Sequence, residues 1–186
     1  MIPTDTIYGI VASALSRSAV ASVYRLRRRD PKKPSIILIG DSDDIGAFGV
    51  RLTPSQKAVL NHIWPGKFSV VFKVPPGRRY LERGTGSLAF RLPRERVLRR
   101  FLMISGPLIA PSANFEGNPP ALDVAGARKY FGDRVDLYVD RGPKKGAPST
   151  LVAFQGRRLK VLRAGAGKLP KGLEYVNMPR KAVKAF

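Results

Sequence analysis

The hydrophobic and polar positions of this chain change repeatedly between a helical period and a strand period, which predicts an α/β fold. Apolar residues at helical spacing predict helices over residues 16–29, 54–63, 95–103 and 123–131. Apolar runs and two-residue alternation predict strands over residues 35–40, 68–74, within 84–93, and over 106–110, 135–139, 148–154 and 158–163. We expect a twisted, mixed parallel and antiparallel open sheet with flanking helices and a concave basic cleft. One domain is expected over residues 1–167, followed by a basic tail over 168–186.

Two of the helices carry more specific signals. Thr53, Pro54 and Gln56 have the spacing of a capping box, which predicts that a helix begins at Pro54. In the helix over 16–29, Arg27 extends the apolar stripe by one turn. The side chain of Arg27 is therefore expected to point toward the core.

Residues 62–64 and the helix over 95–103 are expected to support the fold and not to bind a ligand. His62 lies beside the apolar stripe and is interpreted as exposed or structural, and Trp64 as a core residue at the corner that follows. In the helix over 95–103 the apolar face consists of Val97, Leu98, Phe101 and Leu102. This spacing predicts a plain amphipathic helix.

Composition narrows the chemistry that the chain can perform. The 186 residues include 34 Lys and Arg but only 13 Asp and Glu, a net charge of +21, which should attract polyanions such as structured RNA. The absence of cysteine excludes disulfide partners and thiolate metal sites, and the single histidine removes most zinc sites and makes a serine triad implausible. No apolar run reaches membrane-spanning length, so we expect a cytoplasmic protein with no membrane partner.

The first ten residues combine an apolar lead-in with a dense group of hydroxyls. Pro3 fixes its own backbone, Gly9 permits close backbone approach, and Thr4, Thr6 and Tyr8 supply hydrogen-bond donors and acceptors. Such a turn suits a small polar ligand, although the same residues also suit an ordinary strand-to-loop turn.

Polar residues also stand at or near the ends of later strands. Arg91 interrupts an apolar strand, where an unpaired cation is costly, so it must meet either an internal carboxylate or a ligand carboxylate. Ser112 and Asn114 follow the strand over 106–110, and Arg163 is the polar end of a buried row. These positions predict a crevice at the strand ends.

The turn Pro3-Thr4-Asp5-Thr6-Ile7-Tyr8-Gly9 resembles the hallmark segment of the YrdC-like domain of threonylcarbamoyl-AMP synthases. The resemblance continues in the family's order through residues 24–34, 64–66, 91–93, 110–114, 148–150 and 162–163, and so covers nearly the whole chain. Family members usually carry a helix and the beginning of a strand ahead of this turn, whereas this sequence begins almost on it. The resemblance therefore leaves open whether that part of the sheet is present.

The resemblance implies that threonine and bicarbonate form a carboxylate that attacks the α-phosphate of ATP, giving threonylcarbamoyl-AMP and pyrophosphate for tRNA modification. ATP would be a substrate, accompanied by Mg²⁺, and a downstream threonylcarbamoyl transferase complex would be a partner. The catalytic residues implied are Arg27, Arg29, Ser112 and Asn114. The ATP contacts implied are Arg29, Lys33, Ser87, Ser112, Asn114 and Arg163. The threonine contacts implied are Thr6, Arg91, Ala110 and Ser149, and no metal ligand is implied.

Two positions differ from the family pattern. Arg27 stands where the family has lysine, which keeps the charge but replaces a compact ammonium by a planar fork. Pro120 stands where some relatives have a nucleotide-binding serine, so that contact is expected to be lost or remade.

Two alternatives remain open. The net charge of +21 would also serve a basic module of the same fold that binds tRNA or double-stranded RNA without chemistry. The related carbamoyl-transfer domain of hydrogenase maturation proteins is a third possibility, but that domain normally belongs to a much longer chain that contains cysteine.

Overall fold

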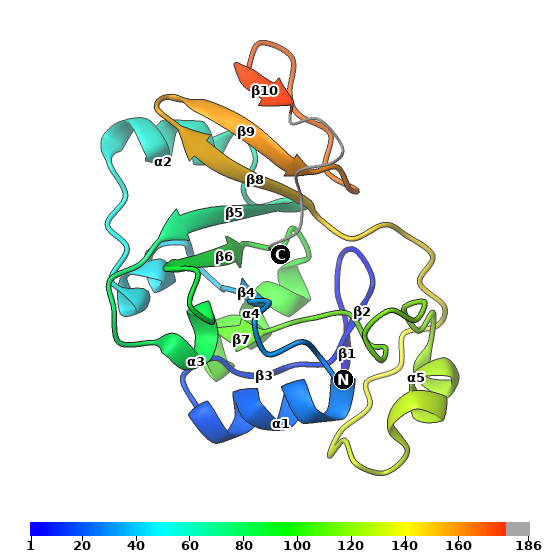
Figure 1. Ribbon diagram of the computed structural model, residues 1–186. Coiled ribbons are helices and arrows are strands. Elements are labelled where there is room, and N and C mark those ends of the chain that lie inside the picture. The colour runs from blue at the N-terminus through cyan, green and yellow to red at the C-terminus, as the bar shows by residue number, and fades with distance from the viewer. Residues whose placement is uncertain (178–186) are drawn as a thin grey trace.

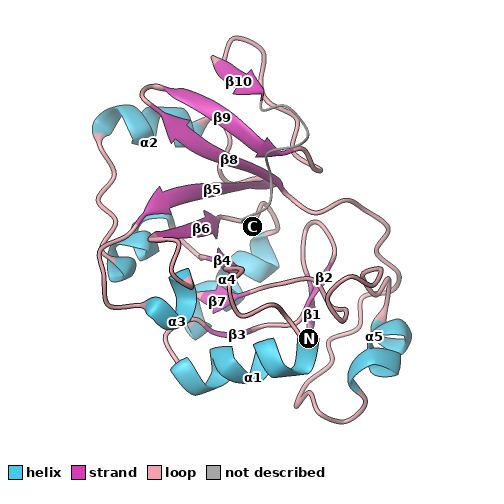
Figure 2. Ribbon diagram, in the orientation of Figure 1, coloured by secondary structure: helices cyan, strands magenta, loops and turns pink. Residues whose placement is uncertain are grey.

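The computed structural model describes residues 1–177 as a mixed sheet surrounded by helices (Figures 1 and 2). The strands are β1 (Ile2–Pro3), β2 (Tyr8–Gly9), β3 (Ala12–Ser13), β4 (Ile36–Leu38), β5 (Phe68–Lys73), β6 (Ser87–Arg91), β7 (Leu108–Ile109), β8 (Thr150–Gln155), β9 (Arg158–Arg163) and β10 (Tyr175–Asn177). The helices are α1 (Arg17–Arg27), η1 (Ser42–Phe48), α2 (Pro54–Asn61), α3 (Arg79–Glu82), α4 (Arg96–Ser105) and α5 (Val124–Phe131).

The main sheet has eight strands in the order β10-β9-β8-β5-β6-β4-β7-β3. The pairs β9–β10, β5–β8 and β4–β6 are parallel, and the other neighbours are antiparallel. Figure 2 shows the strands through the middle of the molecule and the helices around them. The predicted mixed sheet with flanking helices is confirmed.

The first residues form a small hairpin beside the main sheet. Strands β1 and β2 pair antiparallel, with Ile2 opposite Gly9 and Pro3 opposite Tyr8. Behind the hairpin, the carbonyl of Tyr8 accepts a hydrogen bond from the N–H of Ala113, and Gly9 forms an isolated bridge with Ser112. The polar turn at the start of the chain is therefore fixed directly to the Ser112 turn.

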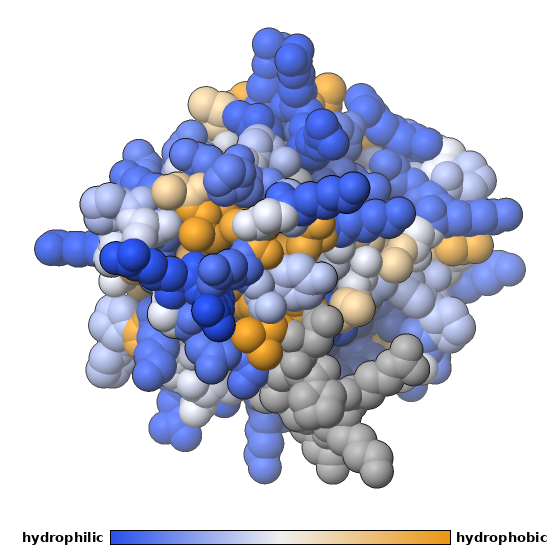
Figure 3. Space-filling view, turned by 90° about the horizontal axis from the view of Figure 1, so that it is seen from above, coloured by the Kyte–Doolittle hydropathy of each residue, from blue (hydrophilic) through white to orange (hydrophobic). Residues whose placement is uncertain are grey.

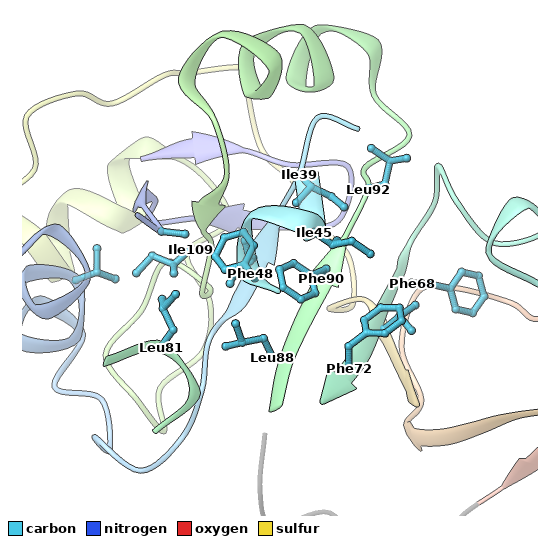
Figure 4. Close-up of a cluster of buried hydrophobic side chains, with 14 of the residues drawn as sticks. Ile39, Ile45, Phe48, Phe68, Phe72, Leu81, Leu88, Phe90, Leu92 and Ile109 are labelled. Carbon is cyan, nitrogen blue, oxygen red and sulfur yellow. The ribbon is translucent and has the colours of Figure 1, made fainter. Parts of the chain in front are cut away.

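Aromatic and branched side chains fill the space between the sheet and its helices (Figure 4). Phe90 is fully buried on the central strand β6 and packs against Phe48, with ring centroids 5.1 Å apart, and against Phe72, at 6.2 Å. A second cluster joins α4 to the sheet and consists of Ile2, Leu38, Leu98, Leu102 and Leu108. These two clusters fix the strands whose ends carry the polar residues.

Several local predictions are confirmed. Helix α2 begins at Pro54 with both hydrogen bonds of the capping box, and Arg27 at the end of α1 is only 2% exposed. Trp64 is buried and donates its indole N–H to the carbonyl of Phe68, whereas His62 is exposed. Helix α1 ends at Arg27, two residues before the predicted end, because Arg28 adopts a left-handed conformation (φ 52°) that closes the helix.

The structure corrects one predicted element and refines another. The predicted amphipathic helix forms as α4, but only Leu98 and Leu102 are buried, while Val97 and Phe101 are exposed, because only one side of the broad apolar face meets β4 and β7. The predicted strand over 135–139 was wrong. Among the described residues its backbone hydrogen bonds are with Met1, through the N–H of Val139 and the carbonyl of Leu137, and Leu137 is 63% exposed.

The C-terminal residues extend the sheet as far as they are described. Strand β10 pairs with β9, and the rest of the predicted basic tail, residues 178–186, lies outside the described residues. Hydrophilic side chains cover most of the face seen from above, with small hydrophobic patches between them (Figure 3). Over the described range, none of the helices has the length and apolar character needed to cross a bilayer.

The close approach of β4 and α4 gives a test of this packing. A Cβ atom on Gly40 would lie 2.8 Å from the backbone nitrogen of Met103 in α4, so Gly40→Ala must push the helix away from the sheet. We expect a loss of about 1–3 kcal/mol in the free energy of unfolding, measured by urea denaturation. Gly46→Ala is the matched control, because nothing lies within 4 Å of its added Cβ. Equal stability of the two variants would contradict the packing described.

Candidate anion-binding cleft

A cleft lies where the hairpin, the α1–β4 loop, the Ser112 turn and the start of β8 meet. It encloses about 670 Å³ of space, part of it open to solvent. Seven of the residues implied by the resemblance line it: Thr6, Arg29, Arg91, Ala110, Ser112, Ser149 and Arg163. These residues come from six separate segments of the chain, so only the folded sheet brings them together.

The floor on the hairpin side is a network of hydroxyls and one ion pair. The hydroxyl of Thr4 donates to the carbonyl of Ile7 (2.7 Å) and lies 2.9 Å from the hydroxyl of Thr6. Arg91 Nη1 donates to Thr6 Oγ1 (2.9 Å). Because Thr4 uses its proton on Ile7, Thr6 donates to Thr4 and keeps its lone pairs toward Arg91 and the cleft.

The internal partner of Arg91 is Asp5. Arg91 Nη2 lies 2.7 Å from Asp5 Oδ1, and both side chains are at most 7% exposed. The second carboxylate oxygen of Asp5 accepts the backbone N–H of Arg94. Of the two partners that the sequence left open for Arg91, the structure contains the internal carboxylate, so any ligand carboxylate would meet an arginine that is already paired.

Arg29 also lines the cleft, and within residues 1–177 it forms no ion pair with a carboxylate. Its Nε donates to the carbonyl of Lys33 (3.2 Å) and its Nη2 to the carbonyl of Pro34 (2.7 Å). Both acceptors are neutral and belong to the same loop. Among the described residues no Asp or Glu lies within ion-pair distance of Arg29, so its positive charge is free to attract an anion.

Arg163 is the second cation in the lining of the cleft that has no ion pair among the described residues. Its Nη2 donates to the carbonyl of Ser149 (3.0 Å), and its Nε is buried with no partner. The side chain of Ser149 is held from below by Ser69, whose hydroxyl lies 2.7 Å away and is fully buried on β5. Both hydroxyls are buried and either can donate in this pair, so the contact fixes the position of Ser149 at the edge of the cleft.

Arg27 lies behind the wall of the cleft and supports the Ser112 turn. Its Nε donates to the carbonyl of Ser112 (2.7 Å), and its Nη2 lies 3.2 Å from both Ser112 Oγ and Asn114 Oδ1. The amide nitrogen of Asn114 donates to the carbonyls of Phe115 and Asn118. Ser112 therefore reaches the cleft, whereas Arg27 and Asn114 hold the turn in place.

The positive charges of this region act on one another. Burial, together with the nearby Arg29, lowers the pKa of Arg27 to about 10. Burial also lowers the pKa of Arg163, again with Arg29 contributing, and the pKa of Arg91, where Asp5 opposes the effect. All of these arginines remain charged at neutral pH, so an anion that enters the cleft would relieve their repulsion.

Besides Asn114, two further implied nucleotide contacts, Lys33 and Ser87, lie outside the lining of the cleft. Lys33 forms an ion pair with Glu116, with Lys33 Nζ 2.9 Å from Glu116 Oε1. Ser87 lies at the start of β6 in a different surface depression, beside Gln56 and Lys73. Their predicted contacts with ATP remain predictions from the resemblance.

Sequence reasoning missed three residues that organise the cleft. From the sequence, Asp5 is interpreted only as part of a motif. An acid in the first turn is nevertheless a candidate partner for Arg91, the arginine that interrupts an apolar strand. Ser69 was hidden in an apolar strand, where a single serine is the only signal. Glu116 gave no local signal, because its partners lie more than 80 positions away.

The cleft is suited to holding a polyanion next to a small polar molecule. Arg29 and Arg163 offer charge without a competing carboxylate, and the hydroxyls of Thr6, Ser112 and Ser149 offer directed hydrogen bonds. Within residues 1–177 there is no group of three or more His, Cys, Asp or Glu side chains that could hold a metal ion.

Comparison with known proteins agrees with this geometry. The Sua5/YciO/YrdC family model, described as "Telomere recombination", matches residues 1–165. A Mycobacterium tuberculosis protein is 34% identical over 167 residues, covering 89% of this chain and 77% of the relative. A threonylcarbamoyl-AMP synthase of Chromohalobacter salexigens is 32% identical over 155 residues, covering 82% of this chain and 84% of its own.

A solved structure has the same fold over most of the chain. The crystal structure of P. abyssi Sua5 complexed with L-threonine superimposes with a TM-score of 0.78 at 26% identity, covering 88% of this chain. This chain spans about half of that protein, 49% of its length. The match of residues 1–165 to the family model, the identity to its curated members and the shared fold give one conclusion: the chain belongs to the Sua5/YciO/YrdC family.

Proposed function

We propose that this protein is a threonylcarbamoyl-AMP synthase. The observation that carries the proposal is the pair Arg29 and Arg163, two arginines without a carboxylate partner in the described residues, in the same cleft as the Thr6, Ser112 and Ser149 hydroxyls. The names of the curated relatives and the threonine complex of P. abyssi Sua5 support the choice of substrates.

In the proposed reaction the amine of threonine adds to bicarbonate with loss of water, and the resulting carboxylate attacks the α-phosphate of ATP. The new bond joins this oxygen to the α-phosphorus, and the bond to the β-phosphate oxygen breaks, so that pyrophosphate leaves. Attack of a small anion on a phosphate needs positive charge and alignment more than a side-chain nucleophile. The product would serve tRNA modification by a downstream transferase.

The residues divide between the two substrates. Arg29 and Arg163 would stabilise the charge of the phosphates, with Ser112 held against them by Arg27 and Asn114. Thr6, Arg91, Ala110 and Ser149 would surround threonine. Mg²⁺ would arrive bound to ATP as part of that substrate, since a phosphate-bound Mg²⁺ needs few ligands from the protein.

The direct test is release of pyrophosphate in the presence of threonine, bicarbonate and ATP, with each component left out in turn. The proposal requires that omission of threonine or of bicarbonate removes the release. Release that does not depend on threonine would indicate simple nucleotide hydrolysis and would refute the proposal.

Replacement of Arg29 tests the phosphate side of the cleft. Because Arg29 supplies charge without a competing carboxylate among the described residues, Arg29→Ala should lower kcat/KM for ATP by about 100-fold or more. Arg25→Ala is the control, since Arg25 is exposed on α1, lies outside the lining of the cleft, and donates from its guanidinium to the hydroxyl of Ser22. Similar losses in both variants would mean that net charge, and not the cleft, attracts ATP.

Replacement of Thr6 tests the threonine side. Thr6→Val keeps the shape of the side chain but removes the hydroxyl that accepts from Arg91. KM for threonine should rise by about tenfold, because one partner of a buried hydrogen bond is lost, while KM for ATP should not change. Steady-state kinetics with each substrate varied would measure both constants, and a larger change for ATP than for threonine would contradict the assignment.

The RNA-binding module is the second candidate, and the net charge of +21 favours it. Arg25 and Arg134 line a shallow surface groove on α1 and the segment after α5, away from the cleft. Arg25→Ala combined with Arg134→Ala should weaken RNA binding and reduce its salt dependence without affecting pyrophosphate release. A protein that binds RNA through these arginines and never releases pyrophosphate would favour the RNA-binding module.

A further inference from the structure

Glu116 connects two walls of the cleft that come from distant parts of the sequence. One wall is the loop between α1 and β4, which carries Arg29, and the other is the turn that carries Ser112. Glu116 follows this turn by four positions, and its side chain is 25% exposed.

The contacts of Glu116 span the whole α1–β4 loop. Its backbone N–H donates to the carbonyl of Arg27 (2.9 Å), and its carboxylate accepts the backbone N–H of Asp30 and the ammonium of Lys33 (2.9 Å). Burial alone would raise the pKa of Glu116, but the hydrogen bonds from Asp30 and Lys33 and the charge of Arg29 hold it below its ordinary value. The carboxylate is therefore ionised at neutral pH and binds Asp30 and Lys33 in the loop, while the backbone N–H of Glu116 binds the end of α1 at Arg27.

Phe115, the residue before Glu116, also contacts the beginning of this loop. The guanidinium of Arg28 stacks over the ring of Phe115 at 4.4 Å from its centroid. Arg28 is the left-handed residue that ends α1, so the chain direction into the loop is set where this stack forms. Phe115 and Glu116 together thus contact the end of α1 and the loop at four residues: Arg27, Arg28, Asp30 and Lys33.

The position of Arg29 depends on this loop. The acceptors of its guanidinium are the carbonyls of Lys33 and Pro34, and the side chain of Lys33 is held by Glu116. A shift of Lys33 would move the carbonyl that Arg29 Nε contacts. Lys33 thus links the other two residues: its ammonium binds Glu116, and its backbone carbonyl accepts a hydrogen bond from Arg29.

We propose that Glu116 is a positioning residue for the anion site. It holds Arg29 at the distance from Ser112 that a nucleotide phosphate requires, and it does so through its ion pair with Lys33. This inference rests on the proposed function for the identity of the anion. It assigns Glu116 no contact with the substrate.

The test compares binding of a non-hydrolysable ATP analogue and of inorganic pyrophosphate to the full chain by titration calorimetry. Glu116→Gln keeps the size of the side chain and removes its charge. We expect its Kd for both probes to rise by roughly threefold to tenfold, because a charge-assisted contact that positions Arg29 is weakened. Lys33→Gln should give a similar rise, and the double variant should add little to either single change.

Glu95→Gln is the matched control. Glu95 also forms an ion pair of 2.9 Å with an arginine, Arg141, and is 26% exposed, but it lies outside the lining of the cleft. Its thermal unfolding midpoint should shift about as much as that of Glu116→Gln, while its Kd for the probes should match the wild type. A Kd that rises only in Glu116→Gln separates positioning from a general loss of stability.

The outcomes distinguish this inference from the proposed function. If the wild type binds both probes and Glu116→Gln binds them equally well or more tightly, Glu116 does not position Arg29. Strictly additive effects of Glu116→Gln and Lys33→Gln would likewise overturn the path through Lys33. If the wild type binds neither probe, the proposed function itself fails, and the inference fails with it.

Discussion

The burial of arginines next to one another is the constraint on which the cleft depends. Among the described residues, Arg27, Arg91 and Arg163 each keep a buried nitrogen without a hydrogen-bond partner, and the charge of Arg29 acts on both Arg27 and Arg163. Such an arrangement costs free energy unless an anion balances it. Backbone carbonyls that accept hydrogen bonds from these arginines offset part of this free-energy cost. The positive charge that remains would favour an anionic ligand in the cleft.

Only some of the arginines in the cleft have a carboxylate that balances their charge, so its two parts suit different ligands. Arg91 is neutralised by Asp5 and touches Thr6, so its side of the cleft is polar but nearly balanced in charge. Arg29 and Arg163 contact only neutral oxygens and leave a net positive charge on the other side. A small zwitterion such as an amino acid fits the balanced side, whereas a polyphosphate fits the charged side. This division follows from one carboxylate, Asp5, in the first turn of the chain.

The parts of the fold that could be predicted from the sequence are local. The capping box at Thr53 and the hairpin of β8 and β9 each depend on residues close in sequence, and all formed. Periodicity and capping signals do not specify contacts over long separations: Arg91 and Asp5 are 86 positions apart, and Arg27 and Ser112 are 85 apart. For Arg91 the cost of an unpaired buried cation requires an anion, but does not say which one. For α4 the periodicity gave a broad apolar face but could not say which side of it meets the sheet, since that depends on where β4 and β7 lie. The motif resemblance named most of the residues that line the cleft, but not the network that holds them.

The central claim is that the cleft joins a carboxylate made from threonine and bicarbonate to the α-phosphate of ATP. Mass spectrometry of the product formed from ¹³C-labelled bicarbonate, threonine and ATP tests it most directly. The account predicts a threonine–carbamoyl–AMP conjugate that carries one labelled carbon and is absent when Arg29 is replaced by alanine. Unlabelled AMP or ADP as the only nucleotide product, or a labelled conjugate that persists in Arg29→Ala at the wild-type rate, would contradict it.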